Sequence, residues 1–326
     1  MKTISAVIIT INNKDVVNAI DSVRSSCSQI VVVDTGSTQE HLGFLKQIEG
    51  IELHHFKWCE DFSAARNYGL QFANGDYILT IDSDEVLEKQ IHADMLTADI
   101  YGIQQINNPT RVENTHPIWS SRLFKNHIGI TYRNKLHETI DHFITPTNYL
   151  RCDAKLIHTG YALSMEDLTK KLDRNERIIK TDYDNEVRNF HLGNFALVRG
   201  KNNKAIRYYK KALKDRLNDE HLAMTYNNMY TAYIKRGFFF RDPVRFLIES
   251  LKLFPNQFYG RSLIIEYLIN TISNRNKETQ VNLIKKQIDI LKNIYQNGLS
   301  QLQNDIEIGA EYFNNKIKEL NKWQLN

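Results

Sequence analysis

The chain of 326 residues has a composition ordinary for a globular protein, and its formal net charge is only +4. Single hydrophobic cores rarely grow beyond about 250 residues, so the length predicts two domains, and the small charge gives no case for a nucleic-acid-binding protein. Three widely spaced cysteines, Cys27, Cys59 and Cys152, form neither a disulfide framework nor a zinc pattern. They suit a reducing compartment, so we expect a cytoplasmic protein.

Short β-branched runs alternate with helical periodicity from the N-terminus onward. The apolar run 4–11 is too short to cross a bilayer and lacks a cleavage site, so it predicts a strand rather than a transmembrane segment or an export signal. The alternation predicts an α/β fold with a doubly wound, mostly parallel sheet. The expected strands are 4–11, 30–34, 51–56 and 77–82, with helices near 15–26, 39–48 and 63–73 and further strand-like pieces at 101–106 and 121–124.

Helical spacing dominates the chain after Tyr161, where Gly and Pro become sparse. We expect an α/β domain over residues 1–160, with an alternative end near 180, and an all-α domain over 161–326. Small and aromatic residues predict a tetratricopeptide-like helix pair, with a degenerate second copy from Tyr226 to Pro255. The positions of the first pair are Leu192, Gly193, Gly200, Ala205, Tyr209 and Ala212. Such repeats stack into concave surfaces that suit extended peptides, or a second copy in a homo-oligomer.

An acidic cluster follows the fourth expected strand directly. Asp82 and Asp84 lie on one face of an extended run and are able to converge on a hard divalent cation, while Ser83 points away. Carboxyl ends of strands in α/β sheets are where ligands bind. The alternative is a solvated acidic turn, which the motif alone does not exclude.

Polar residues also follow the first two expected strands. The first ends in Thr10-Ile11-Asn12-Asn13, and the second ends in Asp34-Thr-Gly-Ser-Thr. Both deliver polar groups to the same sheet edge, so that edge should hold a ligand. Asp34 is suited to accept the imide hydrogen of a uracil. Taken alone, the motif favours the alternative, in which Asp34 caps backbone amides of a turn.

Arg66 and Asn67 fall in the first turns of an expected helix, for which Ser63 is the predicted N-cap. A helix N-terminus supplies amide hydrogens and partial positive charge, and Arg66 adds a planar fork that fits phosphate oxygens or Asp34. A diphosphate would therefore be bound well there. A structural pair between Arg66 and a carboxylate is the alternative, and both roles are compatible.

Taken together and in this order, these motifs resemble family 2 glycosyltransferases of the GT-A fold. The resemblance implies inverting transfer of a sugar from a nucleotide-sugar, usually a UDP-sugar, with Mn²⁺ or Mg²⁺. It implies that Asp34 contacts the base, that Arg66 helps to hold the nucleotide and that Asp84 binds the metal. Asp82 would lie near the ribose or the metal. The nucleotide-binding set implied by the resemblance is Ile11, Asn12, Asp34, Arg66, Asn67, Asp82, Ser83, Lys171 and Arg174.

Two later segments extend the resemblance to enzymes of this family that carry helical repeats, among them the peptide glycosyltransferases of sublancin-type bacteriocins. These segments are 135–140 and 157–161, followed by Lys171 and Arg174. By this resemblance His158 would be a third metal ligand, and the side chains of Lys171 and Arg174 would close over the phosphates. The alternatives are a buried histidine bonded to backbone and a solvated basic face.

Inverting transfer needs a base that removes the acceptor proton, and Glu138 is the first candidate. Asp141 is the nearest rival, Glu85 is a further one, and His137 would orient the acceptor. The acceptor itself would be a Cys, Ser or Thr of a peptide. The competing functions are a transferase acting on a lipid-linked glycan and a non-catalytic repeat adaptor. The basic stretch 201–214 is expected to be a solvated helix face.

Overall fold

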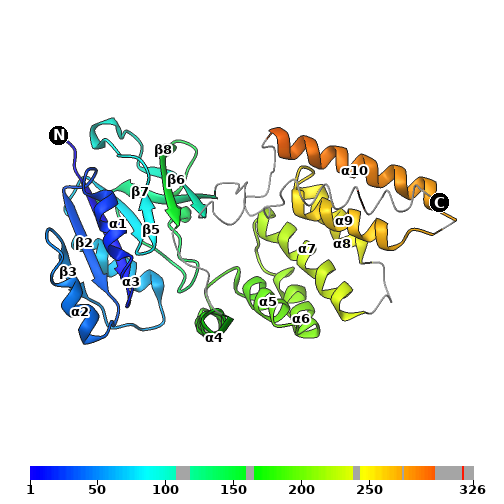
Figure 1. Ribbon diagram of the computed structural model, residues 1–326, viewed down its shortest axis with the longest axis horizontal. Coiled ribbons are helices and arrows are strands. Elements are labelled where there is room, and N and C mark those ends of the chain that lie inside the picture. The colour runs from blue at the N-terminus through cyan, green and yellow to red at the C-terminus, as the bar shows by residue number, and fades with distance from the viewer. Residues whose placement is uncertain (108–117, 159–164, 238–242, 274, 298–317, 319–326) are drawn as a thin grey trace. The chain divides into compact units, whose positions relative to one another are not determined.

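The computed structural model describes residues 1–107, 118–158, 165–237, 243–273, 275–297 and 318 (Figure 1). These residues fall into two units. The first unit holds the described residues up to Asp182, and the second holds those from Tyr183 onward. Because the positions of the two units relative to one another are not determined, each is described by itself.

An eight-stranded mixed sheet forms the centre of the first unit, with the order β3-β2-β1-β4-β7-β6-β8-β5. Four neighbouring strands are parallel, and they are β1 (Ile4–Thr10), β2 (Gln29–Asp34), β3 (Glu52–His55) and β4 (Tyr77–Asp82). The others are β5 (Glu85–Leu87), β6 (Ile100–Asn107), β7 (Ile118–Lys125) and β8 (Tyr149–His158). The pairs β4–β7, β6–β7 and β5–β8 are antiparallel, whereas β6–β8 is parallel. The predicted α/β class is confirmed, and the parallel pairing lies mainly in its first half.

Both faces of the parallel strands are buried because their side chains alternate between two cores. Ala6 and Ile8 belong to the core beneath α1 (Val16–Val23) and α2 (Gln39–Leu45), whereas Val7 and Ile9 face the core on the other side, with Phe72 following α3 (Phe62–Leu70). Short 3₁₀ turns at Ala93–Met95 and Asp141–Phe143 interrupt the later connections. The apolar runs are therefore strands with both faces buried.

Parallel pairing aligns the carboxyl ends of three strands. Thr10 pairs with Asp34, and Ile9 pairs with Asp82, so the polar residues that follow β1, β2 and β4 meet at one edge. Helix α3 begins at the same edge. Its N-cap is Asp61, whose carboxylate accepts a hydrogen bond from the amide of Ala64 at 2.9 Å. The predicted cap, Ser63, is wrong, because the helix begins one residue before it and its hydroxyl donates to Asp61.

Helix α4 (Met165–Thr181) belongs to the first unit. The backbone amide of Lys135 donates to Asp182 just beyond its end, and Arg177 on the helix forms an ion pair with Glu60. These contacts hold one end of α4 against the loops that flank α3. The helix consequently supplies part of the wall of the site described below.

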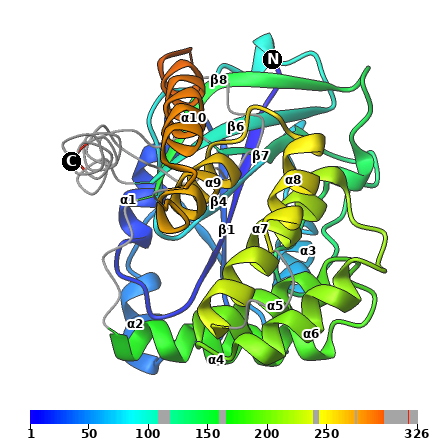
Figure 2. The same cartoon turned by 90° about the vertical axis from the view of Figure 1, so that its right-hand side faces the viewer.

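The second unit is all-α in the part of the chain that is described. Its helices are α5 (Arg188–Val198), α6 (Asn202–Ala212), α7 (Asp219–Arg236), α8 (Val244–Leu253), α9 (Phe258–Asn270) and α10 (Lys277–Asn297). Each packs against the next along the chain, as Figure 2 shows for α7, α8 and α9. Gly193 lies directly against the ring of Tyr209, which lets α5 and α6 approach closely. The predicted helix pair is thus present at these residues.

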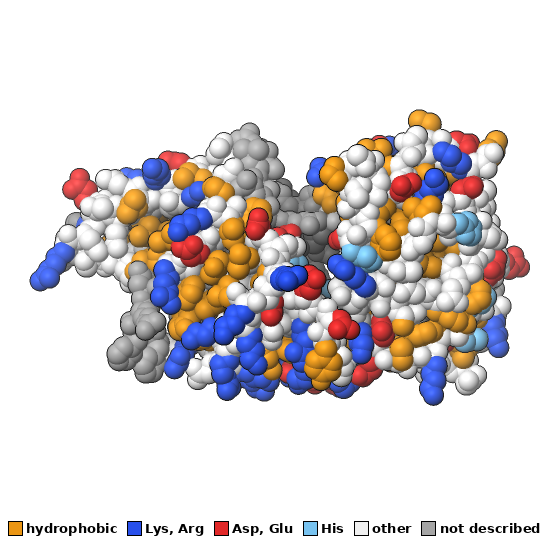
Figure 3. All heavy atoms as spheres, turned by 180° about the vertical axis from the view of Figure 1, so that it is seen from behind, with side chains coloured by type: hydrophobic (Ala, Val, Ile, Leu, Met, Phe, Trp, Pro, Cys, Tyr) orange, Lys and Arg blue, Asp and Glu red, His pale blue; other side chains and the backbone are white. Residues whose placement is uncertain are grey.

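The solvent side of α6 is basic. Figure 3 shows Lys and Arg side chains over one face of the molecule. Arg207, Lys210 and Lys211 on α6 are exposed, as is Lys214 just beyond its end, while Tyr209 and Ala212 on the helix are buried. The basic stretch therefore lies on the outer face of an amphipathic helix, as predicted. Among the described residues, no helix is long and apolar enough to cross a membrane.

Candidate functional site

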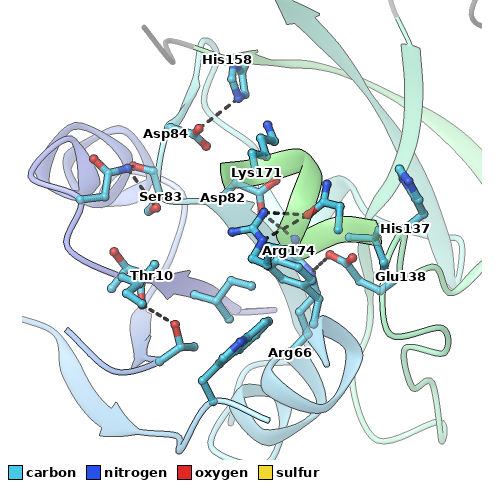
Figure 4. A pocket seen from close by; sticks show the side chains of 18 of the residues that line it. Thr10, Arg66, Asp82, Ser83, Asp84, His137, Glu138, His158, Lys171 and Arg174 are labelled. Carbon is cyan, nitrogen blue, oxygen red and sulfur yellow. Dashed lines mark hydrogen bonds and ion pairs between the residues drawn. The ribbon is translucent and has the colours of Figure 1, made fainter. Parts of the chain in front are cut away.

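A cavity of about 860 Å³ lies at the carboxyl edge of β1 and β4 in the first unit (Figure 4). The strand ends supply Thr10 and Asp82, and the first turns of α3 supply Arg66. The loop 136–138, the end of β8 and one side of α4 complete its wall. The topology thus brings segments far apart in the sequence to one cavity.

Asp82 is held by two arginines. Its Oδ1 lies 2.5 Å from Nη2 of Arg66, and its Oδ2 lies 2.9 Å from Nη2 of Arg122. Burial alone would raise the pKa of the Asp82 carboxyl, but Arg122 and Arg66 outweigh burial and hold this pKa well below its usual range. Asp82 is therefore a fixed anion that orients two guanidinium groups.

Glu85 lies behind this ion pair and is almost fully buried, at 1% exposure. Its carboxylate accepts hydrogen bonds from the backbone amide of Asp82 and from the side chain of Gln105, and it lies 3.8 Å from Arg122. Burial, followed by repulsion from Asp82, raises the pKa of Glu85. Glu85 does not line the cavity, so its contacts indicate support of the turn after β4 rather than direct chemistry.

Arg66 also contacts Glu138, with 2.6 Å between Nε and Oε1. Both residues line the cavity, and the side chain of Arg66 is only 3% exposed. A structural pairing of Arg66 with a carboxylate is therefore present, as the sequence allowed, but its partners are Asp82 and Glu138 rather than the predicted Asp34. A role for Glu138 as the proton acceptor stays a prediction, and the contact with Arg66 competes with it.

Asp84 and His158 approach each other on another side of the cavity (Figure 4). Oδ2 of Asp84 lies 3.1 Å from Nε2 of His158, which is the last residue of β8 and pairs in register with Glu85 of β5. A hydrogen bond with Asp84, opposed by partial burial, raises the pKa of His158. Two of the three predicted metal ligands are thus brought together, while both oxygens of Asp82 face arginines.

The residues after β1 and β2 form a linked pair of turns. Asp34 accepts hydrogen bonds from the amides of Gly36 and Ser37, so the turn-capping interpretation describes its observed contacts. Asn12, whose φ is 47°, accepts from the amide of Thr38 and thereby joins the two turns. Ile11 lines the cavity, with 51% of its surface exposed, whereas Asn12 and Asp34 do not line it.

Three further predicted residues have well-defined contacts. The side-chain amide of Asn67 donates to the carbonyl of Tyr132 and accepts from its amide, so Asn67 fixes the neighbouring loop and does not line the cavity. Ser83 does line it, and its hydroxyl and carbonyl oxygens accept hydrogen bonds from Asn13. Asp141 accepts a hydrogen bond from Ser121 and is not among the lining residues.

Helix α4 contributes cations to the cavity wall. Lys171 and Arg174 both line it, and the guanidinium of Arg174 lies 5.2 Å from the centre of the Phe62 ring. Partial burial, with repulsion from Arg177, lowers the pKa of Arg174. Together with Arg66 and Arg122, these residues surround the cavity with positive charge that is suited to phosphate groups.

Sequence reasoning missed Arg122 and Trp58 as lining residues. Arg122 lies on β7, which pairs with β4, and a charged residue inside an expected strand was the available signal. Trp58 precedes α3 and packs edge-on against Phe62, with ring centroids 4.8 Å apart. For Trp58, the available signal was its position just before the polar motif that begins α3.

Comparison with known proteins finds a family similarity within the first unit. Residues 5–156 match the family model for glycosyl transferase family 2, which confirms the resemblance predicted from the motifs. The SPbeta prophage-derived glycosyltransferase SunS of Bacillus subtilis (strain 168) is 26% identical over 235 residues, which are 67% of this chain and 55% of the relative. The chain therefore spans about half the length of the SunS relatives it matches.

A repeat-containing protein and a solved structure are also similar to this chain. A TPR repeat-containing protein of Synechococcus elongatus is 31% identical over 124 residues, which cover 37% of this chain and 30% of that protein. Among solved structures, S. aureus TarS 1-349 in complex with UDP-GlcNAc aligns with a TM-score of 0.43 and 14% identity. That alignment covers 74% of this chain and 93% of the TarS chain.

Proposed function

We propose that the family 2 glycosyltransferase domain matched by residues 5–156 transfers a hexose, of the glucose or N-acetylglucosamine type, from a UDP-sugar to a Cys, Ser or Thr of a peptide. Transfer would proceed with inversion and with a divalent cation. The observation that carries the proposal is the cavity at the carboxyl edge of β1 and β4. It combines the Asp84–His158 pair with arginines and a lysine in a domain of this family.

The donor proposal rests on charge. A nucleoside diphosphate is anionic both as part of the donor and as the leaving group, so it requires cations at its oxygens. Arg66 is fixed by Asp82 and Glu138 and is therefore preorganised, while Lys171 and Arg174 approach from α4. Fixed donors cost little reorganisation when charge develops on the leaving group. We assign these residues to the diphosphate and the ends of β1 and β2 to the nucleoside.

The metal proposal rests on Asp84 and His158. Their side chains meet at 3.1 Å, and a carboxylate oxygen with an imidazole nitrogen is a donor set that suits Mn²⁺. No group of three candidate metal ligands occurs among the described residues, so phosphate oxygens and water would complete the coordination. A bound cation would neutralise charge on the departing diphosphate. Asp82 is assigned to positioning the arginines instead.

The peptide acceptor is the less direct part of the proposal. It is supported by the motif resemblance to peptide glycosyltransferases that carry helical repeats and by the helical unit, because stacked helix pairs offer extended binding surfaces. A thiol or hydroxyl acceptor would lose its proton as it attacks the anomeric carbon. Within the domain, Glu138 is the candidate proton acceptor that the sequence predicted.

Nucleotide-dependent stabilisation tests the donor and the metal together. We would record the unfolding temperature with UDP, UDP-glucose, UDP-N-acetylglucosamine and matched ADP and GDP compounds, each with and without Mn²⁺. A ligand at about 100 times its dissociation constant stabilises the folded state by about 2.7 kcal/mol. A shift specific to UDP compounds and Mn²⁺ supports the proposal. Equal shifts in unfolding temperature for all nucleotides, or no shift with any of them, would contradict the proposal.

A further inference from the structure

We propose that Tyr132 is a positioning residue for nucleotide binding and that it acts through the guanidinium of Arg66. This inference rests on the proposed function, which assigns Arg66 to the diphosphate, and it adds a residue that lies behind the cavity wall. Tyr132 is only 6% exposed and is not among the residues that line the cavity. Any influence of Tyr132 on a ligand in the cavity therefore passes through a residue that does line it.

The guanidinium of Arg66 has three supports. Its Nη2 contacts Asp82 and its Nε contacts Glu138, toward which it points in Figure 4. Its Cζ lies over the ring of Tyr132, 5.4 Å from the ring centre. A cation at that distance over an aromatic face is attracted by the ring, most strongly where water is excluded. The ring matters because Nη1 of Arg66 is buried and has no hydrogen-bond partner among the described residues.

Tyr132 is itself held at its backbone and at its hydroxyl. The side-chain amide of Asn67 donates to its carbonyl at 2.8 Å and accepts from its amide at 2.7 Å. Its hydroxyl lies 2.7 Å from that of Thr80 on β4, and the Thr80 hydroxyl donates to the carbonyl of Arg122. Because the proton of Thr80 is used there, Tyr132 is the donor to Thr80. The ring beneath Arg66 is therefore fixed in place by α3, β4 and β7.

The ring of Tyr132 is uncharged near pH 7. Burial, opposed by Arg66 and Arg122, raises the pKa of Tyr132 above its ordinary value of 10, so the phenol keeps its proton. An uncharged aromatic face attracts the guanidinium through its quadrupole and adds no third negative charge beside it. The ring consequently supports Arg66 while leaving the positive charge of Arg66 available to an anionic ligand.

The consequence for binding follows from the position of the diphosphate in the proposed function. A cation that is fixed before the ligand arrives costs little reorganisation when it meets phosphate oxygens. Without the ring, the guanidinium of Arg66 would keep its two carboxylates but lose the support over the ring face. Binding of a nucleoside diphosphate should weaken, whereas binding of the nucleoside alone should not change, because it carries no phosphate.

The test changes the electrostatics of the ring while nearly preserving its volume. We would prepare Tyr132→Phe and the same full-length chain with difluorinated or pentafluorinated phenylalanine at position 132, because fluorine withdraws electron density from the ring face. Tyr132→Met removes the ring. The matched control is Tyr77→Met, since Tyr77 is 3% exposed, donates its hydroxyl to the carbonyl of Ala98 and does not line the cavity.

Dissociation constants would be measured by isothermal titration calorimetry with Mn²⁺, directly for UDP and by competition against UDP for uridine. We expect the dissociation constant of UDP to rise stepwise with fluorination, and to rise by about 2- to 30-fold in Tyr132→Met relative to the wild type. The dissociation constant of uridine should be the same in all of these proteins. Tyr77→Met should bind UDP as the wild type does. A purely structural role would not produce a stepwise dependence on fluorine at nearly constant volume.

An unchanged dissociation constant of UDP across the fluorinated series would overturn the inference and leave the proposed function intact. Equal losses of UDP and uridine binding would also overturn it, because Tyr132 would then shape the whole pocket rather than act through Arg66. Absence of UDP binding by the wild type would instead remove the proposed function, and the inference with it. If Tyr132→Met does not fold, the fluorinated series decides alone, since its members retain the ring.

Discussion

Nε of Arg66 and Oε1 of Glu138 lie 2.6 Å apart, although 72 residues separate them in the chain. The contact joins the first turns of α3 to the loop that carries His137. Because Arg66 also holds Asp82 at the end of β4, one guanidinium ties three segments of the cavity together. Its removal should therefore affect both stability and ligand binding.

Replacing Arg66 with Met should destabilise the first unit by about 3–5 kcal/mol, because two carboxylates would lose a buried counterion. The free energy of unfolding would be measured by urea denaturation. Arg24→Met is the matched control, since Arg24 pairs with Asp21 at 2.9 Å but both side chains are exposed. Such surface pairs contribute about 0–1 kcal/mol, so similar losses in the two variants would contradict the buried network.

Separate replacement of Asp84 and His158 with Ala should abolish the Mn²⁺-dependent part of stabilisation by UDP while leaving the fold intact. Both side chains are partly exposed, so their loss should create no large cavity. The control is Asp153→Ala, because Asp153 also has a basic partner, Lys89, but lies outside the cavity wall. Mn²⁺ dependence that survives in the Asp84 and His158 variants would place the metal elsewhere.

Glycine-to-alanine substitutions at Gly193 and Gly43 should change the free energy of unfolding in opposite directions. An added Cβ at Gly193 would overlap the ring of Tyr209, so the α5–α6 pair should lose about 1–3 kcal/mol. Gly43 lies in α2 with nothing near the added carbon, so alanine there should stabilise by about 0.5–1 kcal/mol. Thermal unfolding followed by circular dichroism would measure both. A neutral Gly193→Ala would mean that the two helices pack less closely.

The three cysteines should react with iodoacetamide in a defined order. Burial raises the pKa of the Cys27 thiol to about 12 and also raises the pKa of Cys152, whereas Cys59 is exposed. Only the thiolate reacts, so at pH 8.5 Cys59 should be labelled first and Cys27 last. Mass spectrometry of timed samples would give the order. In urea the three rates should converge, and rapid labelling of Cys27 without urea would contradict its burial.

Sequence patterns predicted the parts of the fold that local chemistry specifies. The β-branched runs marked β1, β2 and β4, and because parallel strands align their carboxyl ends, the positions of Asp34, Asp82 and Asp84 at one edge followed. The antiparallel second half of the sheet was not predicted. Strand β7 pairs antiparallel with β6 and with β4, and the pairing with β4 joins segments far apart in the sequence, which periodicity does not specify.

The partners of the charged residues in the cavity were less predictable. Arg66 was assigned to phosphate or to a carboxylate. The partners of these charged side chains depend on how segments distant in the sequence meet in the fold. Arg66 contacts Glu138, 72 residues away, and Asp82 contacts Arg122, 40 residues away. Arg122 was missed because a single charged residue in a strand is common. The left-handed backbone of His137 has no sequence signal, since only surrounding contacts impose it.

The position of α4 in the first unit affects how this protein should be divided for experiments. A fragment that ends at residue 160 would lack Lys171 and Arg174, and with them one wall of the cavity, although it would retain the whole sheet. It would also lose the acceptor of the Lys135 amide at Asp182, which supports the loop of His137. A fragment that ends after Asp182 keeps both. Nucleotide binding measured on the shorter piece would therefore underestimate the affinity of the intact site.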